Sequence, residues 1–181
     1  RSLTGLIIVL IVAGAAGTLG QVTTRRMGLQ FFRNLAHFTG QNLWFFAITA
    51  APLALVFALE FTSPLWTMAL AALFLGERLT PVKLLAGVLG FLGVLTIVQP
   101  GAQPINLGMV TAALAAIGFA TTAILTKRLT ATETITCILF WLTAIQLCMG
   151  LVACLIDGDM ALPSAATLPW VLVIGVAGLL A

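Results

Sequence analysis

The side chains that could take part in chemistry are the polar groups that interrupt long apolar runs. Arg33, His37, Gln41 and Trp44 recur at helical spacing within residues 31–51, and they fall within an arc of about 80° of one helix face. If this run crosses a membrane, such polar groups are costly there and commonly face an internal cavity. We therefore predict that His37, Gln41 and Trp44 line a solute-binding cavity, whereas Arg33 extends to the membrane interface.

The next apolar run carries a second polar set, Glu60, Ser63, Pro64 and Thr67. The spacing i, i+3, i+4, i+7 places these residues in one stripe of a helix. Because Pro64 has no N–H, it breaks the hydrogen-bond ladder and frees a carbonyl group in the middle of the run. We predict that this stripe faces the same cavity as the first set.

Glu60 is the sharpest candidate of these residues. It lies roughly 9 Å inside its run at 1.5 Å rise per residue, where it could bind a cationic group or exchange a proton. A carboxylate in a wet outer vestibule is an equally good interpretation. His37 could titrate near neutral pH, but a lone histidine is more often a hydrogen-bonded packing residue.

The elements that position these residues follow from the composition. Hydrophobic residues make up 61% of the chain and charged residues 7%, and the mean hydropathy is +1.19, whereas soluble domains carry about 25% charged residues. The chain is therefore expected in a lipid bilayer, where only helices and closed barrels satisfy the backbone. The apolar runs are continuous over about twenty residues, unlike barrel strands of roughly ten alternating residues. The predicted fold class is an all-α polytopic membrane protein.

About seven spans are expected at this length. The first could instead be a cleaved signal peptide, and because the sequence begins at Arg1 and stops inside an apolar run, we expect a fragment of a longer protein. The expected spans are residues 3–21, 31–51, 54–75, 82–98, 107–126, 134–156 and 165–181.

Basic residues mark one side of the membrane. Seven of the eight Lys and Arg residues fall in or beside residues 25–33, 77–83 and 127–133, whereas residues 99–106 and 157–164 contain none. Cytoplasmic loops carry such an excess of Lys and Arg, so these three loops are predicted to be cytoplasmic, with the chain in the bacterial inner membrane. The net charge of +3 reports this topology and not binding to nucleic acid.

The turn between the third and fourth spans has capping chemistry. Thr80 is placed to cap the next helix and Pro81 to occupy its first position, while Glu77 could accept from free N–H groups there. We interpret Glu77 and Arg78 as a structural clamp, with direct substrate contact as the alternative. In the span that follows, small residues are predicted to allow close packing, namely Ala86, Gly87, Gly90 and Gly93.

Metal and cofactor chemistry have no support in the sequence. Cys137, Cys148 and Cys154 share one expected span without CxxC spacing, and there is one histidine, which matches no ligand pattern. We interpret the cysteines as small apolar packing residues, and we expect no metal and no cofactor.

One stretch of the sequence resembles a known family. The segments APLA (51–54), FTSPLWTMALAALFLGERLTP (61–81), GVLGFLGVL (87–95) and the closing QPG resemble the end of the first repeat of an EamA-type drug/metabolite transporter. The segment LGMVTAALAAIGFATTAILTKR (107–128) is similar to the opening helix of the second repeat. The resemblance implies a bundle of about ten helices in two inverted five-helix repeats.

On this plan the chain covers about helices two to eight of ten. Residues 1–101 would form the first repeat without its first helix, and residues 105–181 a truncated second repeat. The charge pattern agrees, because residues 3–21 and 134–156 are expected to cross the membrane in opposite directions.

The resemblance implies a secondary transporter, an exporter or exchanger of small metabolites, amino-acid-like or drug-like solutes, that works by alternating access. No GxxxxGK[ST] loop is present for ATP. An intramembrane enzyme or a non-transport membrane scaffold is the alternative, but Ser63 lies in TSPL and not in GxSxG. An intramembrane protease of the aspartyl type would need two Asp residues inside spans, but both Asp residues lie in a predicted loop. A retinal-binding seven-helix receptor would need a Lys in its last span, and that span has none. The expected partners are a small-molecule substrate and lipid, and the oligomeric state stays open.

Overall fold

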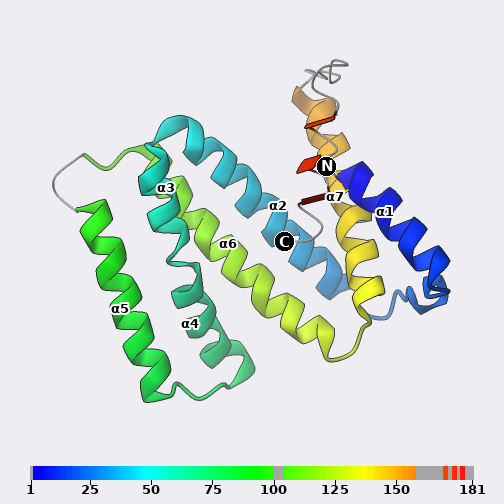
Figure 1. The fold of residues 1–181 in the computed structure, drawn as a ribbon, viewed down its shortest axis with the longest axis horizontal. Helices are drawn as coiled ribbons and strands as arrows, with labels where there is room; N and C mark the ends of the chain where they lie inside the picture. The colour runs from blue at the N-terminus through cyan, green and yellow to red at the C-terminus, as the bar shows by residue number, and fades with distance from the viewer. Residues whose placement is uncertain (1, 100–103, 158–168, 171–172, 175, 178–181) are drawn as a thin grey trace. The chain divides into compact units, whose positions relative to one another are not determined.

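The computed structural model describes residues 2–99, 104–157, 169–170, 173–174 and 176–177 (Figure 1). Within these residues all regular structure is helical, as the sequence predicts. The elements are α1 (Ser2–Ala15), the 3₁₀ turn η1 (Leu19–Gln21), α2 (Met27–Ala50), α3 (Leu53–Glu60), α4 (Ser63–Leu75), α5 (Pro81–Val98), α6 (Leu107–Thr130) and α7 (Ile135–Asp157).

Four segments of the described chain are long and apolar enough to cross a membrane: Leu53–Leu75, Pro81–Val98, Leu107–Thr130 and Ile135–Ile156. They match four of the expected spans. The helix α2 is long enough but carries the polar residues discussed above, and α1 is an apolar helix of 14 residues. Most of the expected last span, residues 165–181, lies outside the described residues.

Three expected boundaries are wrong. The helix α2 begins at Met27, four residues before the expected start of its span at residue 31. The first span was predicted to reach residue 21, but α1 ends at Ala15 because Gly17 takes φ +66°, a conformation that a helix does not contain. The helix α6 continues to Thr130, so Lys127 and Arg128 lie in its last turn and not in a loop.

The chain divides into two compact units, and the first comprises Arg1–Asn34 and Arg128–Ala181. In it α1 packs along α7, and the connection after α1 is bonded to the start of α7. Trp141 donates its indole N–H to the carbonyl of Thr23 at 2.8 Å, and the Thr23 hydroxyl donates to Glu133 at 2.6 Å.

The three cysteines differ in burial. Cys137 is buried beside Thr23, whereas Cys148 and Cys154 are exposed. The interpretation of the cysteines as interior packing residues is therefore wrong for Cys148 and Cys154.

Buried polar side chains are the second feature of the first unit. Gln30, Asn34 and Gln146 are 1%, 0% and 8% exposed, and Gln146 donates to the backbone carbonyl of Asn34 at 3.0 Å. Asn34 in turn donates to the carbonyl of Gln30 at 2.8 Å. Arg33 is 7% exposed, so it does not extend outward as predicted.

The second unit, Leu35–Lys127, has its core where α2, α3 and α6 meet. Ala47, Val56 and Ala112 are completely buried there and pack together. Glycines bring α2 and α6 close: a Cβ atom added at Gly118 would lie 3.0 Å from the Cα of Gly40. Since small residues let helix backbones approach in a membrane, these glycines fix the α2–α6 contact.

The helix α5 forms the outer part of the second unit. It packs on α3 and α4, and Val82, Leu85 and Leu89 on it are 77%, 62% and 61% exposed. The predicted close packing of its glycines holds for Gly87 alone, where an added Cβ would lie 3.0 Å from Met68. No described atom lies within 4 Å of such a Cβ at Gly90 or Gly93.

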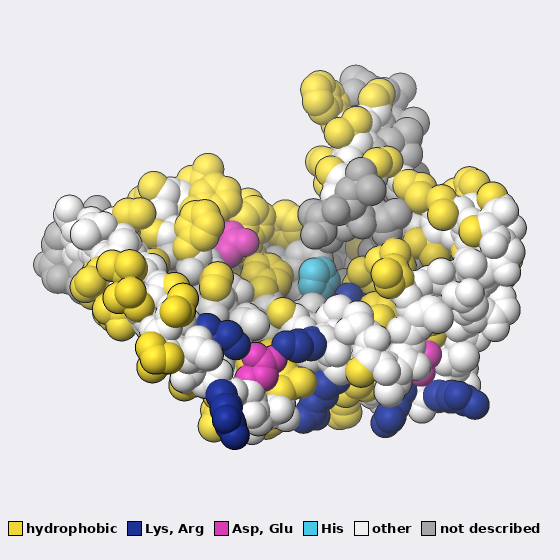
Figure 2. Space-filling view, turned by 60° about the horizontal axis from the view of Figure 1, so that its bottom comes forward, with side chains coloured by type: hydrophobic (Ala, Val, Ile, Leu, Met, Phe, Trp, Pro, Cys, Tyr) yellow, Lys and Arg dark blue, Asp and Glu magenta, His cyan; other side chains and the backbone are white. Residues whose placement is uncertain are grey.

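Apolar exposure extends over much of the described surface. Figure 2 shows hydrophobic side chains across a large part of the face that it draws. Soluble monomeric proteins rarely expose so many large hydrophobic side chains. Together with the four long apolar segments, this exposure identifies a protein whose outer surface contacts lipid.

Candidate functional site

A hydrogen bond between Trp44 and Glu60 lies at the centre of the candidate site. The short connection Ala51–Pro52 turns the chain from α2 into α3, and the two helices diverge from this connection (Figure 1). The indole N–H of Trp44 donates to a carboxylate oxygen of Glu60 at 2.7 Å. The Trp44 ring also contacts Phe57 edge-on, at 6.2 Å between centroids, and packs against the buried core of this unit.

Glu60 is the last residue of α3, and the helix is interrupted directly after it. Phe61 and Thr62 separate α3 from α4, and Pro64 occupies the first turn of α4. Because proline has no N–H, it cannot donate to the carbonyl of Glu60, four residues earlier. The predicted break is confirmed, but Glu60 and Thr67 do not share the stripe of one continuous helix.

The break borders a small cavity of about 380 Å³. Glu60, Ser63 and Pro64 line it together with three phenylalanines, Phe57, Phe61 and Phe119. Glu60 thus borders a space in which three of the five other lining residues are aromatic. Aromatic rings around a carboxylate suit a solute that combines a flat ring system with a hydrogen-bond donor or a positive charge.

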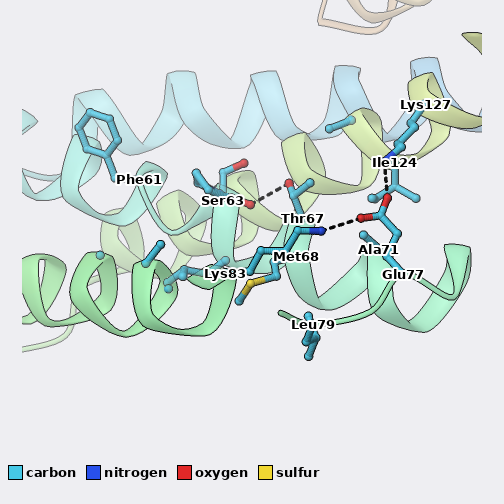
Figure 3. Close-up of a pocket in the computed structure, with 16 residues that line it drawn as sticks. Phe61, Ser63, Thr67, Met68, Ala71, Glu77, Leu79, Lys83, Ile124 and Lys127 are labelled. Carbon is cyan, nitrogen blue, oxygen red and sulfur yellow. Dashed lines mark hydrogen bonds and ion pairs between the residues drawn. The ribbon is translucent and has the colours of Figure 1, made fainter. Parts of the chain in front are cut away.

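A larger cavity, of about 760 Å³, lies between α4, α5 and α6 (Figure 3). It shares Phe61, Ser63 and Pro64 with the small cavity, so the helix break borders both. Thr67 lies on its wall and donates its hydroxyl proton to the carbonyl of Ser63 at 2.9 Å. Most of the other lining residues are apolar, and several of them are small. They include Met68, Ala71, Ala86, Gly87, Gly90 and Ile124.

The α4–α5 turn follows the capping chemistry that the sequence predicts. The Thr80 hydroxyl accepts from the Lys83 N–H at 3.3 Å, and Pro81 is the first residue of α5. Gly76 ends α4 in the left-handed region, with φ +67° and ψ +22°, which glycine adopts without strain. Arg78 is exposed on this turn.

Glu77 forms ion pairs instead of capping α5. One carboxylate oxygen lies 3.1 Å from the Lys83 ammonium group, and the other accepts from Lys127 on α6, so the turn is joined to both helices (Figure 3). The ammonium groups of Lys127 and Lys83 lower the pKa of the Glu77 carboxyl, by hydrogen bonding to it and by charge attraction. These ion pairs join Glu77 to Lys83 and Lys127 and not to Arg78, with which the sequence analysis grouped it. The side chains of Glu77, Lys83 and Lys127 all line the larger cavity.

The structure brings together most of the predicted site residues. Trp44, Glu60, Ser63, Pro64 and Thr67 surround the helix break. His37 lies outside both cavities, but its ring packs 6.1 Å from that of Phe119, which lines the small one. Gln41 is half-buried on α2 and is not among the lining residues of either cavity.

Sequence reasoning missed Phe119, Lys83 and Lys127 as cavity residues. Phe119 gives no polar signal in an apolar run, and the two lysines count in the sequence only as markers of membrane orientation.

Metal binding has no site in the part of the chain that the structure describes. Within these residues no three His, Cys, Asp or Glu side chains lie close enough to hold an ion. The two cavities together carry one carboxylate at the helix break and three charged groups at or near the α4–α5 turn.

Residues 1–99 match the EamA-like transporter family. The chain belongs to the EamA-like transporter family. The match covers the α2–α3 pair, the helix break and the α4–α5 turn, so the arrangement described above lies mainly in the part that defines membership. With its apolar helices, this makes the chain part of a multi-pass membrane protein of a transporter family.

Several transporters are similar to the chain. A riboflavin transporter of Brucella anthropi is 36% identical over 110 residues, 61% of this chain and 39% of that protein. An S-adenosylmethionine uptake transporter of Rickettsia conorii is 31% identical over 118 residues, 65% of this chain and 40% of that protein. A riboflavin transporter of Vibrio cholerae is 26% identical over 171 residues, 94% of this chain and 56% of that protein. The chain thus spans about two fifths of the length of the first two, and no solved structure is significantly similar to it.

Proposed function

We propose that the protein is a secondary transporter that carries a small metabolite with a flat heteroaromatic ring across the bacterial inner membrane by alternating access. The observation that carries this proposal is the Glu60 carboxylate, which Trp44 holds at the helix break, beside two cavities that share lining residues there. Interrupted helices with a polar group at the break are a recurring device of transporter binding sites. The family supports transport as the activity.

The relatives support the substrate class. Their names specify riboflavin and S-adenosylmethionine, and both compounds join a heteroaromatic ring system to a polar chain. Phe57, Phe61 and Phe119 would stack with or contact such a ring, while Glu60 accepts a hydrogen bond or pairs with a cation. The proposed membrane orientation places the α4–α5 turn in the cytoplasm, within a ten-helix bundle of inverted repeats.

Transport of labelled riboflavin and S-adenosylmethionine tests the proposal. Cells that express the protein should accumulate or release one of the two faster than cells without it. We expect Glu60→Gln and Trp44→Phe to reduce this rate by about tenfold or more, because Glu60→Gln removes the charge of the acceptor and Trp44→Phe removes the donor of this hydrogen bond. Trp66→Phe is the matched control, since Trp66 is 42% exposed on α4 and lines neither cavity.

Two results would overturn the proposal. One is the absence of transport of both compounds by well-expressed protein. The other is a wild-type rate in Glu60→Gln, which would show that the carboxylate at the helix break takes no part. The sign of the concentration change separates import from export in the same assay.

A further inference from the structure

The ion pairs of Glu77 lie on the wall of the larger cavity. Lys83, Glu77 and Lys127 come from three different segments, α5, the α4–α5 turn and α6, and all three line this cavity (Figure 3). Two ammonium groups are brought to one carboxylate. The local net charge is therefore positive by one at one end of a cavity that is otherwise apolar and hydroxyl-lined.

Another anion could replace the Glu77 carboxylate beside the lysines with little loss of free energy. The side chains of Lys83, Lys127 and Glu77 are 48%, 59% and 28% exposed, and an exposed ion pair changes an equilibrium by roughly fivefold or less. Glu77 also lies on the turn between two helices, so its side chain can move without disturbing either helix. Another oxyanion could therefore displace it from Lys127 and keep both lysines satisfied.

We propose that Lys127 and Lys83 form a binding site for the anionic group, a carboxylate or phosphate, of a solute in the larger cavity, and that Glu77 occupies this site when no solute is bound. The inference rests on the proposed transport function and adds to the substrate class an acidic end opposite its ring. Lysine ammonium groups are common phosphate and carboxylate binders. The apolar wall formed by Met68, Ala71 and Ile124 would cover the body of such a solute.

An anionic lipid headgroup has the same chemistry as the acidic end of a solute. The geometry favours the solute, because the lysines border a cavity that continues along α4 to Ser63 and Pro64 at the helix break. A headgroup would require the lysines alone. The experiment must therefore separate the two sources.

Phosphate binding to the purified protein tests the inference without any transport measurement. The protein is placed in nanodiscs of neutral phosphatidylcholine, and the midpoint of thermal unfolding is measured against inorganic phosphate, with chloride added to equal ionic strength. We expect phosphate to raise the midpoint in the wild-type protein. In Glu77→Gln the half-saturating phosphate concentration should fall by about fivefold, because a competing charge is removed. In Lys127→Gln the phosphate effect should disappear.

Arg78→Gln is the matched control. Arg78 lies on the same turn and carries the same charge as the lysines, but it does not line the cavity, so its phosphate response should equal that of the wild-type protein. Equal loss in Arg78→Gln and Lys127→Gln would overturn the inference, because it would mean a nonspecific charge effect. No phosphate response in either wild-type or Glu77→Gln protein would overturn it as well.

Binding of an anionic lipid headgroup at this site would give a different result. If phosphate has no effect in neutral nanodiscs but phosphatidylglycerol raises the midpoint in a Lys127-dependent way, the site binds lipid and the inference for a solute is wrong. Failure of the transport function is distinguishable from these results. It would leave the phosphate response intact while Glu60→Gln and wild-type cells handle riboflavin and S-adenosylmethionine alike.

Discussion

Gln30 is a buried amide that gains little from its surroundings. It is 1% exposed, and within the described residues its side-chain oxygen and nitrogen have no hydrogen-bond partner. Gln146, by contrast, donates to the Asn34 carbonyl. Burial of an unsatisfied polar group costs about 1–3 kcal/mol, so these two glutamines should respond in opposite ways to the same substitution.

We predict that Gln30→Met stabilises the protein by about 1 kcal/mol, because methionine has a similar shape and no polar group to satisfy. Gln146→Met should destabilise it by about 0.6 kcal/mol, a typical value for a helix–helix hydrogen bond in a membrane protein. Thermal unfolding in the same detergent checks both variants. A loss of stability in Gln30→Met would show that the amide has a partner in the intact protein.

Glu77 gives the second residue-level prediction, which concerns pH. The nearby lysines lower its pKa in the folded protein, so the ion pairs stabilise the fold above the ordinary glutamate pKa of about 4.3. This contribution is lost as the pH falls from there through the lower folded-state value, where the carboxylate takes up a proton.

We therefore expect Glu77→Gln to be slightly less stable than the wild-type protein at pH 7, with a difference that does not change between pH 6 and 8. The difference should vanish in acid, below the folded-state pKa. Unfolding midpoints of the two proteins across pH 3–8 measure it. A difference that grows toward acid pH would contradict the assigned ion pairs.

Among the helices, the contact of α6 with the end of α2 is the most sensitive to side-chain size. A Cβ atom added at Gly108 would lie 2.8 Å from the Ala50 carbonyl carbon and 2.8 Å from the Ala51 Cβ. Backbone atoms cannot move aside as a flexible side chain does. Gly90 on α5 has no described atom within 4 Å of such a Cβ.

We predict that Gly108→Ala destabilises the protein by about 1–3 kcal/mol, as overpacking does. Gly90→Ala should be neutral or stabilising, since alanine is the better helix former. Unfolding midpoints and the yield of monodisperse protein compare the two. Equal stability of both variants would mean that the helix ends separate easily.

Helix existence was predictable from the sequence, and helix contacts were not. Long apolar runs identify four spans to within a few residues, and Thr80-Pro81 gives the start of α5 because capping depends on neighbouring residues alone. Gly40 and Gly118 on the other hand meet through the tertiary arrangement. The glycine-rich face of α5 misled the packing prediction, because small residues permit a close approach but do not specify a partner.

The candidate site was predictable only in part, because local sequence signals identify its residues but not their tertiary contacts. Glu60, Ser63 and Pro64 are conspicuous because polar residues and proline are unusual in an apolar run. The prediction that they share one stripe is wrong, because helical spacing aligns residues only along a continuous helix and the helix is interrupted before Pro64. The link from Glu77 to Lys127 joins residues 50 positions apart, and nothing local to either residue specifies it.

For the whole molecule, the decisive constraint is that one uninterrupted helix must cross the bilayer. The helix α6 contains 24 residues, which span about 36 Å at 1.5 Å per residue, against a hydrocarbon core of about 30 Å. Ile105 just before it is 80% exposed, and Ala131 just after it is exposed as well. These two positions must therefore lie on opposite sides of the membrane.

We propose that the end of α6 that carries Lys127 and Arg128 is cytoplasmic, because cytoplasmic loops carry an excess of Lys and Arg. We predict that a cysteine in Ile105→Cys reacts with a membrane-impermeant maleimide in intact cells, whereas one in Ala131→Cys reacts only after the membrane is permeabilised. The unsubstituted protein corrects for Cys137, Cys148 and Cys154. The opposite pattern would invert the proposed topology, and the Lys127–Glu77 site would then face a solute outside the cell.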